Sequence, residues 1–197
     1  MQRQATNFLG INFSFIVYAT AFLFLVPLRV AMAWSLAVLV HELSHYIMIK
    51  LCGISVSSVC LQCSGVVMTT QAMTNKQEML CALAGPVGGL SLLLTARWLP
   101  CTAICAFALS CYNLLPIFPL DGGRALRCVF LGMFGPIRGA QVSNIITYIL
   151  LGILALLAFY VTWKIGINIF TLGVVGMVIY KLCIIKIPCK QLKQIVQ

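Results

Sequence analysis

The chain has 197 residues, of which 62% are hydrophobic and only 8% are charged, and its mean hydropathy is +1.07. A soluble domain of this length has too little interior to hide so much apolar surface, so the composition excludes a soluble class and indicates one polytopic membrane domain over residues 1–197. The net charge of +10 would suggest nucleic acid in a soluble protein. Here the basic residues fall at the ends of apolar segments, without interleaved aromatics, so we expect no nucleic-acid partner.

Hydropathy predicts an all-α polytopic membrane fold with about six transmembrane helices. The predicted spans are residues 8–26, 30–51, 79–99, 101–118, 142–163 and 165–185, and a short basic tail, 186–197, follows. The connection between the second and third spans is rich in Ser, Thr, Gly and β-branched residues, which favours strands over a helix. We predict a small membrane-associated β-hairpin there, turning around Gly65.

The placement of lysine and arginine predicts the orientation in the membrane. With six spans, the side that holds both termini carries ten of the thirteen basic residues, and the other side carries three, namely Arg29, Arg97 and Lys164. Both termini are therefore expected in the cytoplasm. The polar motif of the second span lies in the last third of that span, nearer the cytoplasmic face.

The second span contains VLVHELSHYIMI, which places both histidines of the chain and one of its three carboxylates within five residues. Residues i and i+4 share one face of a helix, so His41 and His45 can direct ring nitrogens at one metal ion, as in H-E-x-x-H zinc sites. Glu42 is placed to take a proton from a metal-bound water, whose pKa zinc lowers from about 15.7 to about 7. The alternative is a polar cluster without metal, although a carboxylate at that depth is costly and normally faces a cavity or a partner.

A catalytic zinc of this type needs a third protein ligand, and the remaining acids are Glu78 and Asp121. Glu78 lies beside Lys76 at the start of a span, where helix N-terminal charge or a surface pair would explain it. Asp121 follows the proline-broken end of the fourth span, on the same side as the motif, and is the favoured ligand. Its alternative roles are capping of a basic helix that starts near Gly122 and pairing with Arg124.

Two further polar features have open interpretations. Asn113, in the apolar run before Asp121, could donate to the carbonyl oxygen of a scissile peptide or make an interhelical hydrogen bond. Cys60 and Cys63 could form a metal or redox pair. No other Cys or His pair completes such a site, so packing of reduced thiols is the simpler interpretation.

HELSH in one span and NLLPIFPLDGG in a later one resemble the signatures of the site-2 protease family of intramembrane zinc metalloproteases, H-E-x-x-H and N-x-x-P-x-x-P-x-D-G. ALAGPVGG resembles the Gly-Pro element between them, and the resemblance covers residues 8–128. It implies a peptidase of the M50 type with one Zn²⁺ held by His41, His45 and Asp121. It also implies Glu42 as catalytic base and acid, and Asn113 as a group that binds the substrate carbonyl.

The predicted hairpin resembles the family's membrane-associated hairpin, which presents a strand to an unwound substrate. Gly65, Val66 and Val67 are therefore expected to bind substrate. The resemblance implies a substrate that is a membrane or membrane-associated protein within the lipid bilayer, and it leaves room for a regulatory membrane partner.

The six spans and short length look most like the bacterial sporulation subgroup of the family, whose substrate is a pro-sigma factor. We expect a bacterial cell membrane as the location. Neither a CBS domain after the last span nor a PDZ domain within the chain is expected. The alternative function is a non-catalytic metal-binding membrane protein or a metal transporter, which would carry polar groups along several spans.

Overall fold

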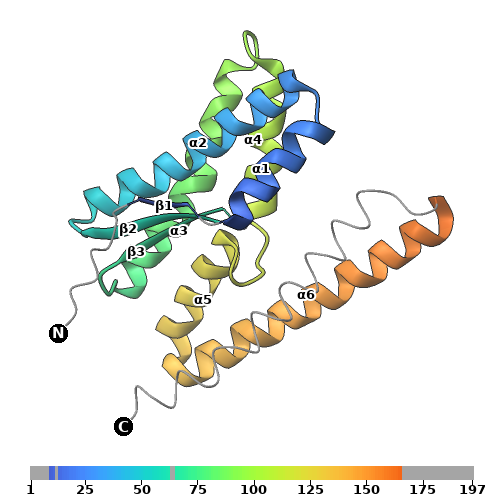
Figure 1. Ribbon diagram of the computed structural model, residues 1–197. Helices are drawn as coiled ribbons and strands as arrows, with labels where there is room; N and C mark the ends of the chain where they lie inside the picture. Colours follow the sequence, from blue (N-terminus) through green and yellow to red (C-terminus); the bar gives the residue numbers. More distant parts are fainter. Residues whose placement is uncertain (1–8, 12, 63–64, 166–197) are drawn as a thin grey trace. The chain divides into compact units, whose positions relative to one another are not determined.

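A computed structural model describes residues 9–11, 13–62 and 65–165 (Figure 1). The chain divides into two compact units between Ser143 and Asn144, and the site described below lies in the first unit. In chain order the elements are β1 Leu9–Ile11, α1 Phe13–Leu25, α2 Leu28–Leu51, β2 Val56–Gln62, β3 Gly65–Thr70, α3 Asn75–Ser91, the 3₁₀ turn η1 Leu92–Thr95, α4 Pro100–Asn113, α5 Asp121–Phe134 and α6 Pro136–Ile165.

Three of the described helical segments are long and apolar enough to cross a membrane, namely Leu28–Leu51, Asn75–Thr95 and Pro136–Lys164. By contrast, α1 and α4 have 13 and 14 residues, or about 20 Å of helix against an apolar thickness of about 30 Å. A mostly helical fold with three candidate spans is thus confirmed. The count of six spans stays a prediction, since residues 166–185 and the basic tail lie outside the described residues.

Several predicted boundaries shift for local chemical reasons. Residues 9–11, assigned to the first span, form strand β1. Helix α3 begins at Asn75 because Thr74 and Gln77 form a capping box that satisfies its first backbone N–H groups. Helix α4 ends at Asn113, ahead of Pro116, which disfavours helical conformation in the residue before it. Asp121 is consequently the first residue of a separate helix, α5.

The predicted hairpin is present as β2 and β3, which pair antiparallel with Leu61 opposite Val66 and Gln62 opposite Gly65. Gly65 opens β3 with a φ of +117°, a conformation that only glycine adopts readily. Strand β1 pairs in parallel with the other side of β2, giving the order β1-β2-β3. In the described part of the chain β3 therefore has one free edge.

Helix α2 buries alanines and a histidine on one face and exposes large apolar residues elsewhere. Ala33, Ala37 and His41 are buried, and Ala33 and Ala37 pack against Cys105 and Ala106 of α4. The exposed side chains on the opposite face are Leu36, Leu39, Leu43 and Ile47. This pattern is the reverse of a soluble helix and is expected where lipid is the solvent, because helices in a bilayer associate through small residues and polar contacts.

A stripe of three glycines, Gly85, Gly88 and Gly89, allows α3 to approach its neighbours closely. They are spaced three and four residues apart and so share one face of the helix. A Cβ atom at Gly85 would overlap the imidazole of His45, and one at Gly88 would overlap the hydroxyl of Ser44, both on α2. The glycines therefore fix how near α3 comes to the polar face of α2.

We expect Gly88→Ala to lower the free energy of unfolding by about 1–3 kcal/mol, because the new methyl group overpacks against Ser44. The matched control is Gly132→Ala on α5, where a Cβ would meet nothing within 4 Å. It should leave stability unchanged or slightly raised, since alanine is the better helix former. Unfolding of the purified protein in detergent micelles measures both. Equal midpoints for the two variants would contradict the packing argument.

Candidate metal centre

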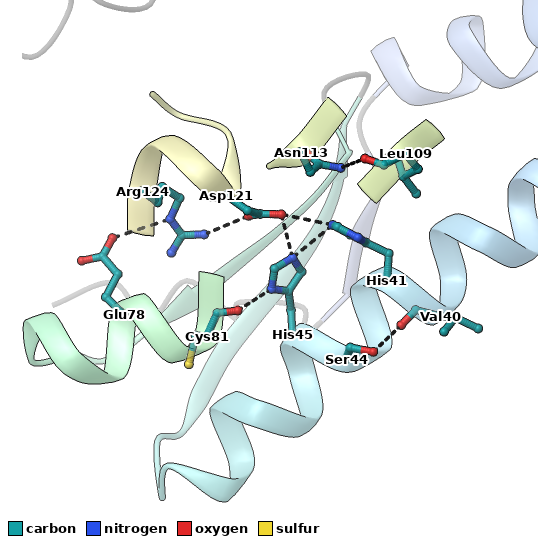
Figure 2. Close-up of polar contacts among 10 residues, drawn as sticks. All are labelled: Val40, His41, Ser44, His45, Glu78, Cys81, Leu109, Asn113, Asp121 and Arg124. Carbon is teal, nitrogen blue, oxygen red and sulfur yellow. Dashed lines mark hydrogen bonds and ion pairs between the residues drawn. The ribbon is translucent and has the colours of Figure 1, made fainter. Parts of the chain in front are cut away.

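Two histidines and one aspartate converge where α2 meets the start of α5 (Figure 2). His41 and His45 lie one turn apart on α2, and the Nε2 atoms of their rings are 3.2 Å from each other. Each Nε2 is also 3.2 Å from Oδ2 of Asp121. Ligand atoms at zinc bond lengths in a tetrahedral site lie about 3.3 Å apart, so these three atoms have the spacing of one tetrahedral face.

The chemistry of the three atoms also fits a cation. Nδ1 of His45 lies 2.7 Å from the backbone oxygen of Cys81 on α3. Because a carbonyl oxygen only accepts, Nδ1 carries the hydrogen, and Nε2 of a neutral ring presents a lone pair. That lone pair faces a carboxylate oxygen of Asp121 at 3.2 Å. A metal ion at this point satisfies both acceptors, and zinc prefers imidazole and carboxylate ligands of this kind.

Asp121 is held by contacts on both of its oxygens. Its Oδ2 faces both imidazole rings, and the ionised form of a carboxyl group is the form that binds metal. Its Oδ1 lies 3.9 Å from Nη1 of Arg124, whose Nε is 3.6 Å from Oε1 of Glu78.

These contacts bear on the alternative roles considered for the two acids. Asp121 contacts the histidines and also makes the pair with Arg124 that was considered as an alternative, and its role as a metal ligand stays a prediction. The capping role is not seen, because the N-cap of α5 is Leu120 and has no side-chain cap. Glu78 makes a surface pair, with Arg124 as its partner. Within the described residues, His41, His45 and Asp121 are the one group spaced to hold a metal ion.

Glu42 lies between the metal centre and the hairpin. It follows His41 on α2, and its carboxylate is close to the backbone N–H of Val66. A Cβ atom at Gly65 would lie 3.7 Å from Oε1 of Glu42, and the neighbouring Val67 is exposed. Glu42, which is predicted to transfer protons, thus lies beside Gly65 and Val66, two of the residues predicted to bind substrate.

The contacts of Asn113 and Cys60 do not test the functional roles predicted for Asn113 and for the cysteine pair. The side-chain amide of Asn113 donates to the backbone oxygen of Leu109, 3.1 Å away in its own helix (Figure 2), which is not the interhelical bond considered as an alternative. Cys60 is a half-buried free thiol on β2. Cys63 lies outside the described residues, so the pairing of the two cysteines remains untested.

Two features that orient His45 were not predicted. One is the carbonyl of Cys81, which leaves no sequence signal because every residue has a carbonyl. The other is Gly85, where any larger residue would occupy the position of the imidazole. The spacing of the glycines in AGPVGG, all on one helix face, was the signal that could have indicated this close approach.

We expect Asp121→Asn to weaken zinc binding by more than about 100-fold, because removing a direct ligand exceeds the usual effect of an outer contact. The matched control is Glu78→Gln, which alters the acid that was considered as an alternative ligand and contacts only Arg124 among the charged groups described. It should keep one zinc per chain. Metal content of the purified proteins after dialysis measures this, and zinc loss in the Glu78 variant alone would contradict the ligand assignment.

Comparisons with known proteins agree with this geometry. The profile of peptidase family M50 matches residues 94–157, which include Asp121. Zinc metalloprotease MJ0392 of Methanocaldococcus jannaschii is 26% identical over 121 residues, covering 54% of this chain and 36% of that protein. Rip3 of Mycobacterium tuberculosis, named as a zinc metalloprotease, is 30% identical over 144 residues, covering 59% of this chain and 36% of that protein. The chain thus spans 36% of the length of these curated relatives.

A solved structure has the same fold. The site-2 protease from Methanocaldococcus jannaschii matches with a TM-score of 0.64 and 22% sequence identity, over 87% of each chain. The M50 profile, the two relatives and this fold together confirm the resemblance to the site-2 protease family that the motifs HELSH and NLLPIFPLDGG predict.

Proposed function

We propose that the chain is an intramembrane zinc metalloendopeptidase that cuts a peptide bond in or near a transmembrane segment of a membrane-associated protein. The observation that carries the proposal is the convergence of three ligand atoms at 3.2 Å from His41, His45 and Asp121, with Glu42 beside them. The zinc metalloprotease names of two relatives support it. All three ligands belong to one site, whereas a transport path would need polar groups spread along several spans.

Zinc, when bound, would polarise the substrate carbonyl and make water acidic enough to supply hydroxide near pH 7. Glu42 would accept the proton from that water and pass it to the leaving amine. The Val66 N–H holds the Glu42 carboxylate against the start of β3. Asn113 uses one amide hydrogen on Leu109, and its second N–H would remain for the substrate carbonyl oxygen.

The free edge of β3 would hold the substrate as an added strand. The N–H of Val66 is directed at Glu42, so it is not directed at β2. Backbone groups along an antiparallel strand alternate between its two sides. Val66 and Met68 therefore present their N–H groups to the free edge, next to the proposed catalytic carboxylate. An extended substrate there exposes peptide bonds that a helix would hide.

The membrane setting and partners follow from the same proposal. The three candidate spans support a centre within a lipid bilayer, and the excess of basic residues on one side favours cytoplasmic termini and a site toward the cytoplasm. A bacterial cell membrane, a pro-sigma or other regulatory factor as substrate, and a regulatory membrane partner complete the proposal.

We expect Glu42→Gln to keep one zinc per chain and to lower cleavage by about 100- to 10,000-fold, because the amide cannot carry the proton. Membrane proteomes of cells that produce the wild-type or the Glu42→Gln protein would identify substrates as proteins shortened by the wild type alone. Cleavage by the variant at the wild-type rate would contradict the mechanism. Zinc uptake into sealed vesicles, with no shortened protein, would favour transport instead.

We expect Met68→Pro to lower cleavage of such a substrate by about tenfold, because proline removes one edge N–H that would bond the added strand. Met68→Ala is the matched control: it removes the side chain, which packs partly against the core cluster of Ile54 and Val56, but keeps the N–H. Zinc content should not change in either variant. Equal cleavage by the two variants would argue against strand addition at β3.

A further inference from the structure

The second nitrogen of the His41 ring faces away from the ligand cluster and lies close to a hydroxyl of α4. His41 is 3% exposed and Ser110 is 0% exposed. Nδ1 of His41 and Oγ of Ser110 are fully buried, and neither has a hydrogen-bond partner in the described part of the chain. Buried polar atoms are normally paired, so two that lie near each other call for a common explanation.

The hydroxyl of Ser110 does not follow the usual arrangement for a helix. Five other helical hydroxyls donate to a carbonyl three or four residues earlier, namely those of Thr20, Ser44, Ser91, Thr95 and Thr162. This back-bonding is the common way for Ser and Thr to satisfy a hydroxyl within a helix. Ser110 makes no such bond to Ala106, and its hydroxyl is directed at Gly89 of α3.

Gly89 of α3 lies next to both atoms. A Cβ atom there would overlap Oγ of Ser110 and would lie 3.7 Å from Nδ1 of His41. The two atoms therefore lie within about 6 Å of each other, a separation that one water molecule bridges. The backbone oxygen of Ala106, 3.8 Å from the same point, offers a third hydrogen-bonding group, and buried waters typically make about three such contacts.

We propose that Ser110 is a positioning residue for His41, accepting through one bound water a hydrogen bond that originates at Nδ1–H. This inference rests on the proposed zinc site. The bond would hold the hydrogen of His41 on Nδ1 and leave the lone pair of Nε2 for the metal, as the Cys81 carbonyl does for His45. The two ligand rings would thus be oriented by two different helices, α3 for His45 and α4 for His41.

The test is zinc affinity of the full-length protein in detergent micelles, measured by competition with a chromophoric chelator. Ser110→Ala should weaken zinc binding by about tenfold, within the range found for partners of ligating histidines. Ser44→Ala is the control, since Ser44 also packs on the glycine stripe but bonds its own helix, and it should bind zinc as the wild type does. Equal weakening in both variants would overturn the proposal in favour of lost packing.

An isosteric pair separates the hydroxyl from its volume. Ser110→Thr and Ser110→Val crowd the site equally, so the threonine variant should bind zinc about tenfold more tightly than the valine variant if the hydroxyl matters. Equal affinities would overturn the proposal even where both variants are less stable than the wild type. A wild-type protein that binds no zinc would instead overturn the proposed function, which keeps the two failures distinguishable.

A second measurement reports on the ring itself. The chain has two histidines, so a ¹⁵N-histidine spectrum of the zinc-loaded protein contains two rings. One Nδ1 signal should shift between the wild type and Ser110→Ala, and the other, held by the Cys81 carbonyl, should stay in place. Two unshifted signals would show that Ser110 does not contact the His41 ring through hydrogen bonds.

Discussion

The rest of the structure depends on one constraint. Two imidazole nitrogens and one carboxylate oxygen lie 3.2 Å from one another inside an apolar helix bundle. With both Nε2 atoms carrying lone pairs, as we propose, these groups and the carboxylate repel one another unless a cation lies among them, and the repulsion is strong where little water screens it. The neighbouring groups hold these donors in place rather than relieve the repulsion. The Cys81 carbonyl fixes one ring, and Arg124 holds the carboxylate oxygen that faces away from the histidines.

Close helix packing makes this convergence possible. In lipid there is no hydrophobic gain from burying leucines, so helices associate where small residues let their backbones approach. Here the same glycines that bring α3 against α2 also make room for the functional side chains. Gly85 lies against the imidazole of His45, and Gly89 lies next to Ser110 and His41. Packing and the metal centre therefore share residues, and a substitution in the stripe affects both.

The local parts of the site could be predicted from the sequence, and the contacts between distant helices could not. The i, i+4 spacing of His41 and His45 needs only a helix, and the scarcity of acids left few candidates beside Asp121. The carbonyl partner of His45 depends on how α3 lies against α2, which periodicity does not specify. Strand β1 is three residues long and forms because β2 is available as a partner. For Asn113, the structure shows a bond within its own helix in place of the interhelical bond considered as an alternative, and its role toward a substrate carbonyl stays a prediction.

The direction of β3 determines which part of a substrate the strand would contact. The strand starts at Gly65, beside Glu42, and its six residues run away from that carboxylate to Thr70. A chain laid along it would extend about 20 Å, at roughly 3.3 Å per residue, from the reacting groups in one direction only. Under the proposed function, the sheet would contact substrate residues on one side of the cleaved bond only, starting at the metal centre. Specificity would then depend on the sequence on that side of the cut and largely not on the sequence on the other side.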